Sequence, residues 1–177
     1  MEKTRQTDSN IVLIGMPGSG KSTVGVILAK MTAREFVDTD ILIETSLGRT
    51  LQDIVDTDGY IALRKIEEEV LLGLTVRNHV IATGGSAVYS DNSMLHLKAD
   101  SIVIFLDVNI ATLKLRVPDF GSRGLAKLPN QSFAELFAER APLYRTYADI
   151  RIACDEFTHE EVCQRIIEEV KVYITHG

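Results

Sequence analysis

The chain has 177 residues, of which 45% are hydrophobic, so it is long and apolar enough to bury the core of one domain. Its net charge of -6 argues against a general nucleic-acid or acidic-membrane binder, because both of those partners need a basic face. The two cysteines, Cys154 and Cys163, match no metal-binding spacing, which indicates reduced thiols and a cytoplasmic protein.

The first ten residues are polar and of mixed charge, without the apolar stretch of a secretion signal. No later run reaches the ~18 to 20 apolar residues of a membrane-spanning helix. We therefore expect a soluble cytoplasmic protein, with no membrane or nucleic-acid partner, that exists as a monomer.

Strand-like and helix-like patterns alternate along the whole chain. The predicted strands cover residues 11–14, 35–38, 79–82, 101–106 and 149–153. The predicted helices cover residues 23–30, 41–47, 51–55, 59–74, 92–97, 109–116, 132–147 and 160–174. This alternation predicts a three-layer α/β/α fold with a five-stranded parallel sheet, in a single domain over residues 1–177. Ligands of such sheets bind beyond the carboxyl ends of the strands.

A phosphate-binding motif of the form G-x-x-x-x-G-K-S spans residues 15–22, between the first strand and the first helix. Its glycines let backbone N–H groups surround phosphate oxygens at a helix N-terminus. Lys21 supplies a point charge and the Ser22 hydroxyl a ligand for Mg²⁺. A chance glycine-rich turn is the alternative. We expect a nucleoside triphosphate to contact Gly18, Ser19, Gly20, Lys21, Ser22 and Thr23.

Two aspartates, Asp38 and Asp40, follow the second strand. On an extended segment this spacing points both carboxylates to the same side. Near a P-loop, one is suited to hold Mg²⁺ through water and the other to accept a hydroxyl proton. The alternative is an acidic turn that caps the helix beginning near Ile41.

Arg64 and the pair Gly84-Gly85 are further candidates for binding an acceptor. The guanidinium of Arg64 offers a planar fork for a carboxylate, although spacing alone favours a surface pair with Glu68 one helical turn later. Gly84-Gly85 is either a simple turn or a place where the backbone approaches a ligand closely.

The segment 117–130 contains two prolines and two glycines and no periodic pattern, which is typical of a lid or binding loop. Arg123 lies in it between two glycines, suited to reach phosphates and neutralise charge in a transition state. Arg116, seven residues earlier, is suited to stack on a base. Further on, Arg140 precedes Pro142 inside a helical pattern, where a proline disturbs the helix unless something local compensates.

Taken together, these motifs resemble the shikimate kinase family, in the family's order and over nearly the whole chain. The motifs that carry the resemblance are the P-loop, Asp38-Thr39-Asp40, Arg64 with Glu67, Thr83-Gly84-Gly85, the arginine of the candidate lid, and Glu139-Arg140-Ala141-Pro142-Leu143-Tyr144 with Ala148. The resemblance implies a P-loop kinase of the nucleoside-monophosphate-kinase-like fold. It also implies Mg²⁺-dependent transfer of phosphate from ATP to the shikimate 3-hydroxyl, in aromatic amino-acid biosynthesis.

The resemblance further implies roles for single residues. Asp40 would bind the ring hydroxyls and accept the proton, and Asp38 would support the water shell of Mg²⁺. Arg64 and Arg140 would hold the shikimate carboxylate, with the Gly84-Gly85 backbone facing the ring.

On the nucleotide side, Arg123 would reach the phosphates from the lid and Arg116 would contact adenine, with residues 153–157 lining the adenine side. Lys21, Asp40 and Arg123 are the expected catalytic residues, and Ser22 with Asp38 the expected metal ligands.

Four residues depart from the family pattern. Ser86 stands in place of a third glycine, Tyr60 in place of an acidic residue, Leu63 in place of phenylalanine, and Gly124 in place of the proline after the lid arginine. We expect these four changes to affect which acceptor the protein uses, and to have little effect on its use of ATP. Two other functions therefore stay open: a related kinase acting on another polyol, hydroxy acid or nucleoside monophosphate, and a nucleotide-binding module without turnover.

Overall fold

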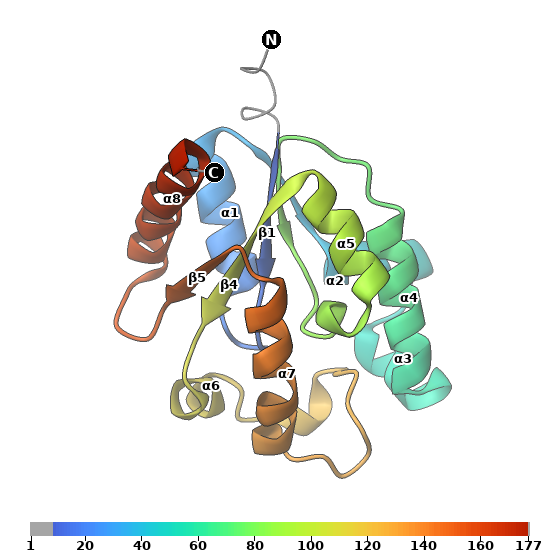
Figure 1. The fold of residues 1–177 in the computed structure, drawn as a ribbon. Coiled ribbons are helices and arrows are strands. Elements are labelled where there is room, and N and C mark those ends of the chain that lie inside the picture. Colours follow the sequence, from blue (N-terminus) through green and yellow to red (C-terminus); the bar gives the residue numbers. More distant parts are fainter. Residues whose placement is uncertain (1–8, 177) are drawn as a thin grey trace.

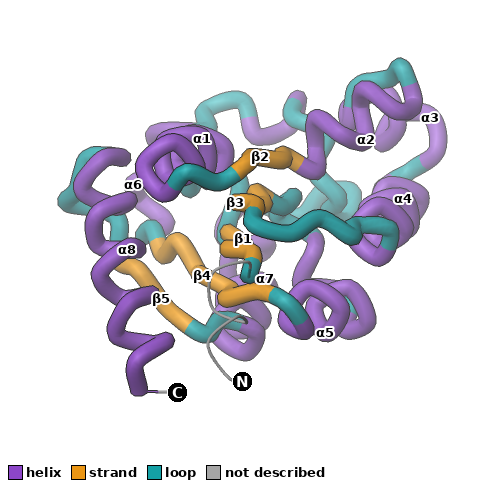
Figure 2. The backbone as a smooth tube through the Cα atoms, turned by 90° about the horizontal axis from the view of Figure 1, so that it is seen from above, coloured by secondary structure: helices purple, strands orange, loops and turns teal. Residues whose placement is uncertain are grey.

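The computed structural model describes residues 9–176, so most of the polar N-terminal stretch lies outside it. All neighbouring strands of the sheet are parallel (Figure 1), in the order β2-β3-β1-β4-β5 (Figure 2). This confirms the predicted five-stranded parallel sheet. The strands are β1 (Asn10–Ile14), β2 (Glu35–Asp38), β3 (His79–Ala82), β4 (Ser101–Asp107) and β5 (Ile150–Ala153).

Each predicted helix is present, with ends that differ by a few residues. The α-helices are α1 (Lys21–Thr32), α2 (Thr39–Leu47), α3 (Leu51–Asp58), α4 (Tyr60–Leu72), α5 (Asp91–Ala99), α6 (Ile110–Arg116), α7 (Phe133–Tyr147) and α8 (His159–His176). Two short 3₁₀ helices, η1 (Ala87–Tyr89) and η2 (Phe120–Ser122), are additional. Several differences arise at caps, since Asn109 and Ser132 accept backbone hydrogen bonds just before α6 and α7 instead of lying inside them.

The sheet is covered on both faces. Helices α1 and α8 pack together on one face, while α5 and α7 pack against β4 on the other; α4 packs beside α5, and α2 and α3 pack against α4 (Figure 2). The central strand β1 is buried along its whole length, as expected for a parallel strand with helices above and below.

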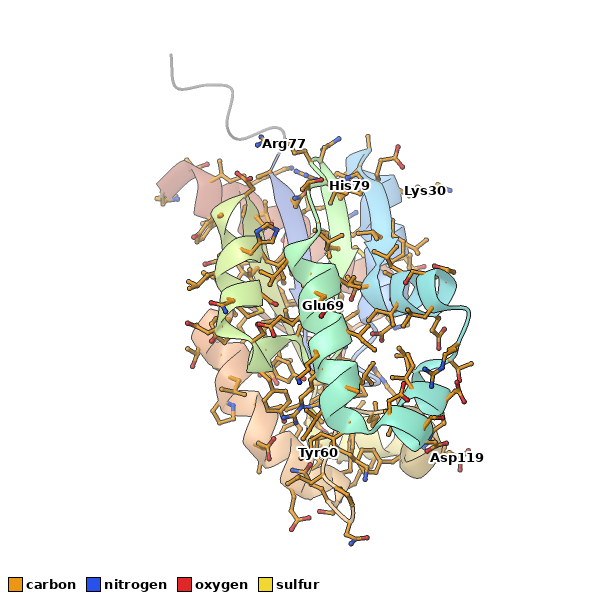
Figure 3. The ribbon with its side chains drawn as sticks, turned by 90° about the vertical axis from the view of Figure 1, so that its right-hand side faces the viewer. Lys30, Tyr60, Glu69, Arg77, His79 and Asp119 are labelled. Carbon is orange, nitrogen blue, oxygen red and sulfur yellow. The ribbon has the colours of Figure 1, made fainter. Side chains whose placement is uncertain are left out.

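Helix α4 links the two ends of the molecule. Its first residue, Tyr60, lies at the same end as Asp119 of the segment 117–130, while Arg77 and His79 lie at the opposite end and Glu69 between them (Figure 3). The carboxyl ends of the strands, the P-loop and the first turns of α4 therefore gather at one end.

Helix α7 continues through Pro142, although that residue cannot donate the hydrogen bond that a helix normally forms there. Contacts with the rest of the chain hold the helix on both sides of the proline. The buried side chain of Arg140 bonds the carbonyl of Ala126, and the Tyr144 hydroxyl donates to the carbonyl of Gly85 at 2.6 Å. These tertiary contacts override the local preference.

Candidate active site

The P-loop connects β1 to α1 and is shaped by glycines with positive φ. Gly18 has φ +82°, and Gly20, the N-cap of α1, has φ +94°, values that side chains other than glycine rarely adopt. The Lys21 ammonium group donates to the carbonyls of Gly15 at 2.8 Å and Met16 at 2.9 Å. Burial lowers the pKa of Lys21 to about 8, against the raising effect of Asp40.

Ser22 and Asp38 form an oxygen pair beside the P-loop. The Ser22 hydroxyl donates to Asp38 Oδ2 at 2.5 Å. Hard oxygen donors of this kind suit Mg²⁺, which takes few protein ligands and keeps several waters. Within residues 9–176 no group of three or more histidine, cysteine, aspartate or glutamate side chains could hold a metal ion. The Ser22 and Asp38 oxygens match the donor chemistry of Mg²⁺.

Asp38 and Asp40 do not lie on one extended segment, so that part of the prediction is wrong. Asp38 ends β2 and caps α2, its Oδ1 accepting from the backbone of Asp40 at 3.0 Å and of Ile41 at 3.3 Å. Asp40 lies in the first turn of the helix because this cap starts it there. Burial, together with the nearby Asp38 charge, raises the pKa of Asp40 to about 6.

Two cavities meet at Asp40. The larger, about 270 Å³, is lined by P-loop residues including Lys21 and Ser22, and the smaller, about 50 Å³, is lined by Arg140 and Glu67 among others. The residues common to both are Asp40, Gly85, Arg123 and Leu125. A group bound in the larger cavity and one bound in the smaller would therefore face each other across the Asp40 carboxylate.

Arg64 and Arg140 converge on one point. Both donate through Nη2 to the carbonyl oxygen of Ala126, at 3.2 Å and 2.9 Å. Arg140 is only 1% exposed. The alternative pairing of Arg64 with Glu68 is wrong, because Glu68 accepts from the Ser90 hydroxyl at 2.6 Å and Arg64 turns toward the segment 117–130. The two guanidinium groups thus form a fork around a single oxygen acceptor.

Gly84 and Gly85 are places of close approach. A Cβ on Gly84 would overlap the Glu67 carboxylate and lie 2.7 Å from Asp40 Oδ1, and one on Gly85 would lie 2.7 Å from Arg140 Nη1. The backbone therefore fits here only without side chains, so it borders the smaller cavity directly.

The segment 117–130 lies against α3 and the site. The backbone N–H of Gly124 donates to the side chain of Gln52, and the exposed Arg123 lines both cavities. Arg116, also exposed, donates to the carbonyl of Gly18 at 3.4 Å, which places it beside the P-loop and away from the acceptor fork.

The structure adds Glu67 and Tyr89 to the site. Glu67, which the sequence indicated only through its place near Arg64, is 3% exposed, and its carboxylate accepts from the Ser86 hydroxyl. Burial, with the nearby Asp40 charge, raises the pKa of Glu67 to about 7. Tyr89 packs against Arg64, which no local pattern signals because η1 and α4 are distant in sequence.

A parallel sheet with a P-loop after β1, a buried lysine and a carboxylate between two cavities defines this protein as a P-loop phosphotransferase. The family model for shikimate kinase matches residues 17–171. The chain therefore belongs to the shikimate kinase family, as its motifs indicated.

Individual relatives agree with the family model. The chain is 36% identical over 163 residues to the shikimate kinase of a Sulfurihydrogenibium species, covering 92% of this chain and 98% of that protein. It is 38% identical over 170 residues to that of Symbiobacterium thermophilum, covering 92% and 96%. The solved structure of shikimate kinase from Acinetobacter baumannii in complex with shikimate superposes with a TM-score of 0.87, at 32% identity and over 96% and 97% of the two chains.

Proposed function

We propose that this protein transfers the γ-phosphoryl group of ATP to the 3-hydroxyl of shikimate, giving shikimate 3-phosphate and ADP in the pathway to aromatic amino acids. The observation that carries the proposal is that Arg140, one member of the Arg64–Arg140 fork, lines the same cavity as Asp40. A carboxylated ring held by that fork presents its hydroxyls to the boundary between the two cavities. The Ala126 carbonyl marks the position of an oxygen that both arginines can bind.

In the proposed reaction, the acceptor hydroxyl oxygen forms a bond to the γ-phosphorus, and its proton passes to the Asp40 carboxylate. The bond from that phosphorus to the β,γ-bridging oxygen breaks, and ADP leaves with the electron pair. Burial that keeps the pKa of Asp40 near 6 leaves it ionised at neutral pH, yet more basic than an ordinary aspartate.

The P-loop side of the proposal assigns the phosphates to Gly18, Ser19, Gly20, Lys21, Ser22 and Thr23. Lys21, now bonded to carbonyls of its own loop, is within the same cavity and would turn its charge to the transferred phosphate. Mg²⁺, when bound by Ser22 and through water by Asp38, would neutralise phosphate charge. Arg116 would contact adenine, with residues 153–157 on the adenine side.

The segment 117–130 is proposed to be the lid. Arg123 reaches both cavities from it, so closure would bring a cation to the transferring group and exclude water, which favours transfer to the acceptor over hydrolysis. Gly84 and Gly85 would let the acceptor ring approach the backbone.

The same proposal takes the chain to be a single-domain cytoplasmic monomer that binds neither nucleic acid nor membrane. Its net charge of -6 is in keeping with this. No helix within residues 9–176 has the length and hydropathy that crossing a bilayer requires.

A coupled assay of ADP release tests the proposal across a panel of acceptors at saturating Mg-ATP. We expect turnover with shikimate and at least a hundredfold lower kcat/KM with hydroxy acids that lack the ring and with nucleoside monophosphates. Turnover that prefers another acceptor, or ATP binding without turnover on any acceptor, would overturn it.

A further inference from the structure

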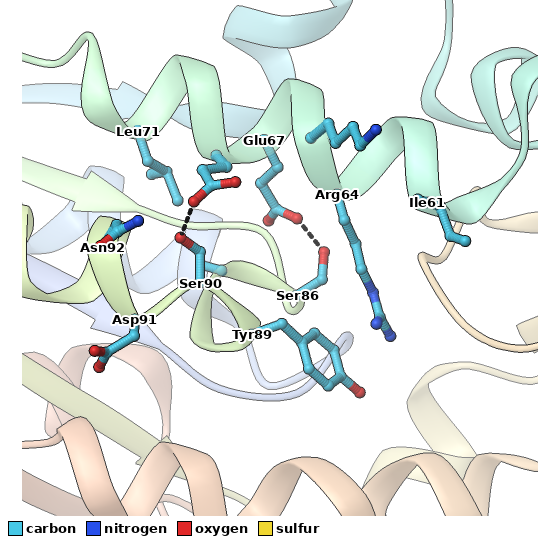
Figure 4. Close-up of a pocket in the computed structure, with 12 residues that line it drawn as sticks. Ile61, Arg64, Glu67, Leu71, Ser86, Tyr89, Ser90, Asp91 and Asn92 are labelled. Atoms are coloured by element: carbon cyan, nitrogen blue, oxygen red, sulfur yellow. Dashed lines mark hydrogen bonds between the residues drawn. The ribbon is translucent and has the colours of Figure 1, made fainter.

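Tyr89 lies at the end of η1 and is half-buried beside the arginine fork. Figure 4 shows its ring beside the guanidinium end of the extended Arg64 side chain, with the Ser86–Glu67 hydrogen bond on the same side of that arginine. The Arg64 guanidinium carbon is 3.7 Å from the centroid of the Tyr89 ring, and that of Arg140 is 5.2 Å from the same centroid. One ring therefore contacts both members of the fork.

The two arginines carry like charges and approach the same oxygen, so their mutual repulsion must be offset by neighbouring groups. Among the described residues, neither forms an ion pair with a carboxylate. The face of an aromatic ring attracts a guanidinium without accepting hydrogen bonds in its plane. The face of the Tyr89 ring therefore stabilises the two charges without itself occupying their N–H donors, whereas a paired glutamate would occupy them.

A second ring adds to this arrangement on the Arg64 side only. The Arg64 guanidinium carbon is 5.2 Å from the centroid of the Tyr60 ring. Arg64 thus lies between two aromatic side chains, and of these two rings only that of Tyr89 also contacts Arg140. Tyr89 is therefore the aromatic side chain that both members of the fork share.

The hydroxyl of Tyr89 fixes the orientation of the second arginine. It accepts a hydrogen bond from Arg140 Nε at 3.2 Å and donates one to the carboxylate of Glu139. Glu139 is held in turn by Gln131, whose side-chain amide donates to it at 2.9 Å. With Nε engaged in this way, Nη2 of Arg140 reaches the carbonyl oxygen of Ala126.

We propose that Tyr89 is a positioning residue that holds Arg64 and Arg140 as a preformed clamp and thereby sets selectivity for an acceptor bearing a carboxylate. The inference rests on the proposed function, which makes the fork the acceptor-binding group. Because Tyr89 already orders the two long cationic side chains in the free protein, less side-chain conformational entropy is lost when the acceptor binds.

The test compares Tyr89→Leu and Tyr89→Phe with the wild-type chain, using shikimate and its carboxamide analogue. For Tyr89→Leu we expect the KM for shikimate to rise about tenfold, with kcat changed less than twofold and the KM for ATP unchanged. For the carboxamide, whose carboxylate charge is gone, wild type and variant should agree within twofold. Tyr89→Phe keeps the ring and should restore the KM to within threefold of wild type.

Three further variants keep the comparison decisive. Tyr147→Phe is the matched control, since that hydroxyl donates to Asp91 away from the fork, and it should change nothing. If Tyr89→Leu does not fold, Tyr89→Met fills the space without a π face and carries the same expectation. Tyr60→Leu should raise the KM by less than Tyr89→Leu, because Tyr60 contacts only Arg64.

An unchanged KM in Tyr89→Leu, or an equal rise for shikimate and carboxamide, would overturn the role of Tyr89. Failure of the proposed function would look different, because the wild-type chain would then release no ADP with shikimate. In that event calorimetric binding of shikimate and the carboxamide to the same variants gives the same comparison without turnover, and equal affinities of wild type and Tyr89→Leu would overturn the inference.

Discussion

The Ser86 hydroxyl donates a hydrogen bond to the buried carboxylate of Glu67, joining the turn after β3 to the middle of α4. This contact exists because the chain has serine at a position where the family usually has a third glycine. A donor to a carboxylate favours its charged form, while burial and the Asp40 charge oppose it. The balance raises the pKa of Glu67 to about 7, so the charge of the acceptor site changes near neutral pH.

Replacing Ser86 tests this balance directly. Ser86→Ala removes the donor, so we expect the pKa of Glu67 to rise by about one unit, as a hydrogen bond to a charged group is worth about 1.5 kcal/mol or more. Carboxyl ¹³C NMR titration of glutamate-labelled protein measures it. Ser93→Ala is the control, since the buried Ser93 hydroxyl has no partner among the described residues. An unchanged Glu67 titration in Ser86→Ala would contradict the contact.

Glu67 also makes stability depend on pH. Its pKa is higher in the folded state than the ordinary 4.5, so the folded state binds the proton more tightly and stability is lost as pH rises through about 7. Glu67→Gln removes this loss. The free energy of unfolding of Glu67→Gln minus that of wild type should therefore be about 3 kcal/mol larger at pH 8 than at pH 4, measured by urea unfolding at each pH.

The exposed Glu135 provides a control of opposite sign for that experiment. Hydrogen bonds from Ser132 lower the pKa of Glu135, so it contributes stability above its ordinary pKa that is lost as pH falls. Glu135→Gln should therefore lose stability relative to wild type as pH rises. A Glu67→Gln variant that followed the same direction would contradict the raised pKa of Glu67.

The pH dependence of turnover follows from Asp40 and Lys21. Asp40 must be ionised to accept the proton, and Lys21 must be charged to hold the phosphates, so kcat/KM should fall below pH about 6 and above pH about 8. Asp40→Asn should lower kcat by roughly 10² to 10⁴. Asp53→Asn, at a surface residue paired with Arg49, should leave kcat unchanged. A loss of less than tenfold in Asp40→Asn would exclude Asp40 as the base.

Gly124 allows the segment 117–130 to lie on α3. Its φ is +58° and a Cβ there would overlap the backbone of Leu51 and Gln52. Gly124→Ala should therefore hold the segment away and lower kcat/KM for the acceptor at least fivefold in steady-state assays, with little effect on ATP binding. Gly121→Ala, where a Cβ meets open space, is the matched control. Equal kinetics for the two variants would contradict this role of Gly124.

The sheet and the P-loop could be predicted because their signals are local. Apolar runs define the strands, and the spacing from Gly15 to Ser22 carries the phosphate chemistry by itself. The convergence of the strand ends followed from topology. The backbone conformation at Asp38 and Asp40 could not be predicted in the same way, since a side-chain cap decides where α2 begins.

The details of the acceptor site depend on contacts between distant segments. Arg64 lies on α4, Tyr89 on η1 and Arg140 on α7, and nothing in the spacing of these residues shows that one ring contacts both arginines. Spacing favoured Glu68 as the partner of Arg64, and the fold overruled it. Pro142 is likewise tolerated only because its neighbours are anchored elsewhere.

The most direct test of the account is the stoichiometry and position of transfer. Wild-type protein is incubated with Mg-ATP and shikimate, ADP is quantified, and the product is analysed by mass spectrometry and by ³¹P–¹H coupling. We expect one phosphate on shikimate per ADP, attached at the 3-hydroxyl, and almost none with Asp40→Asn. Release of ADP without a phosphorylated shikimate, or phosphate at another hydroxyl, would contradict the account.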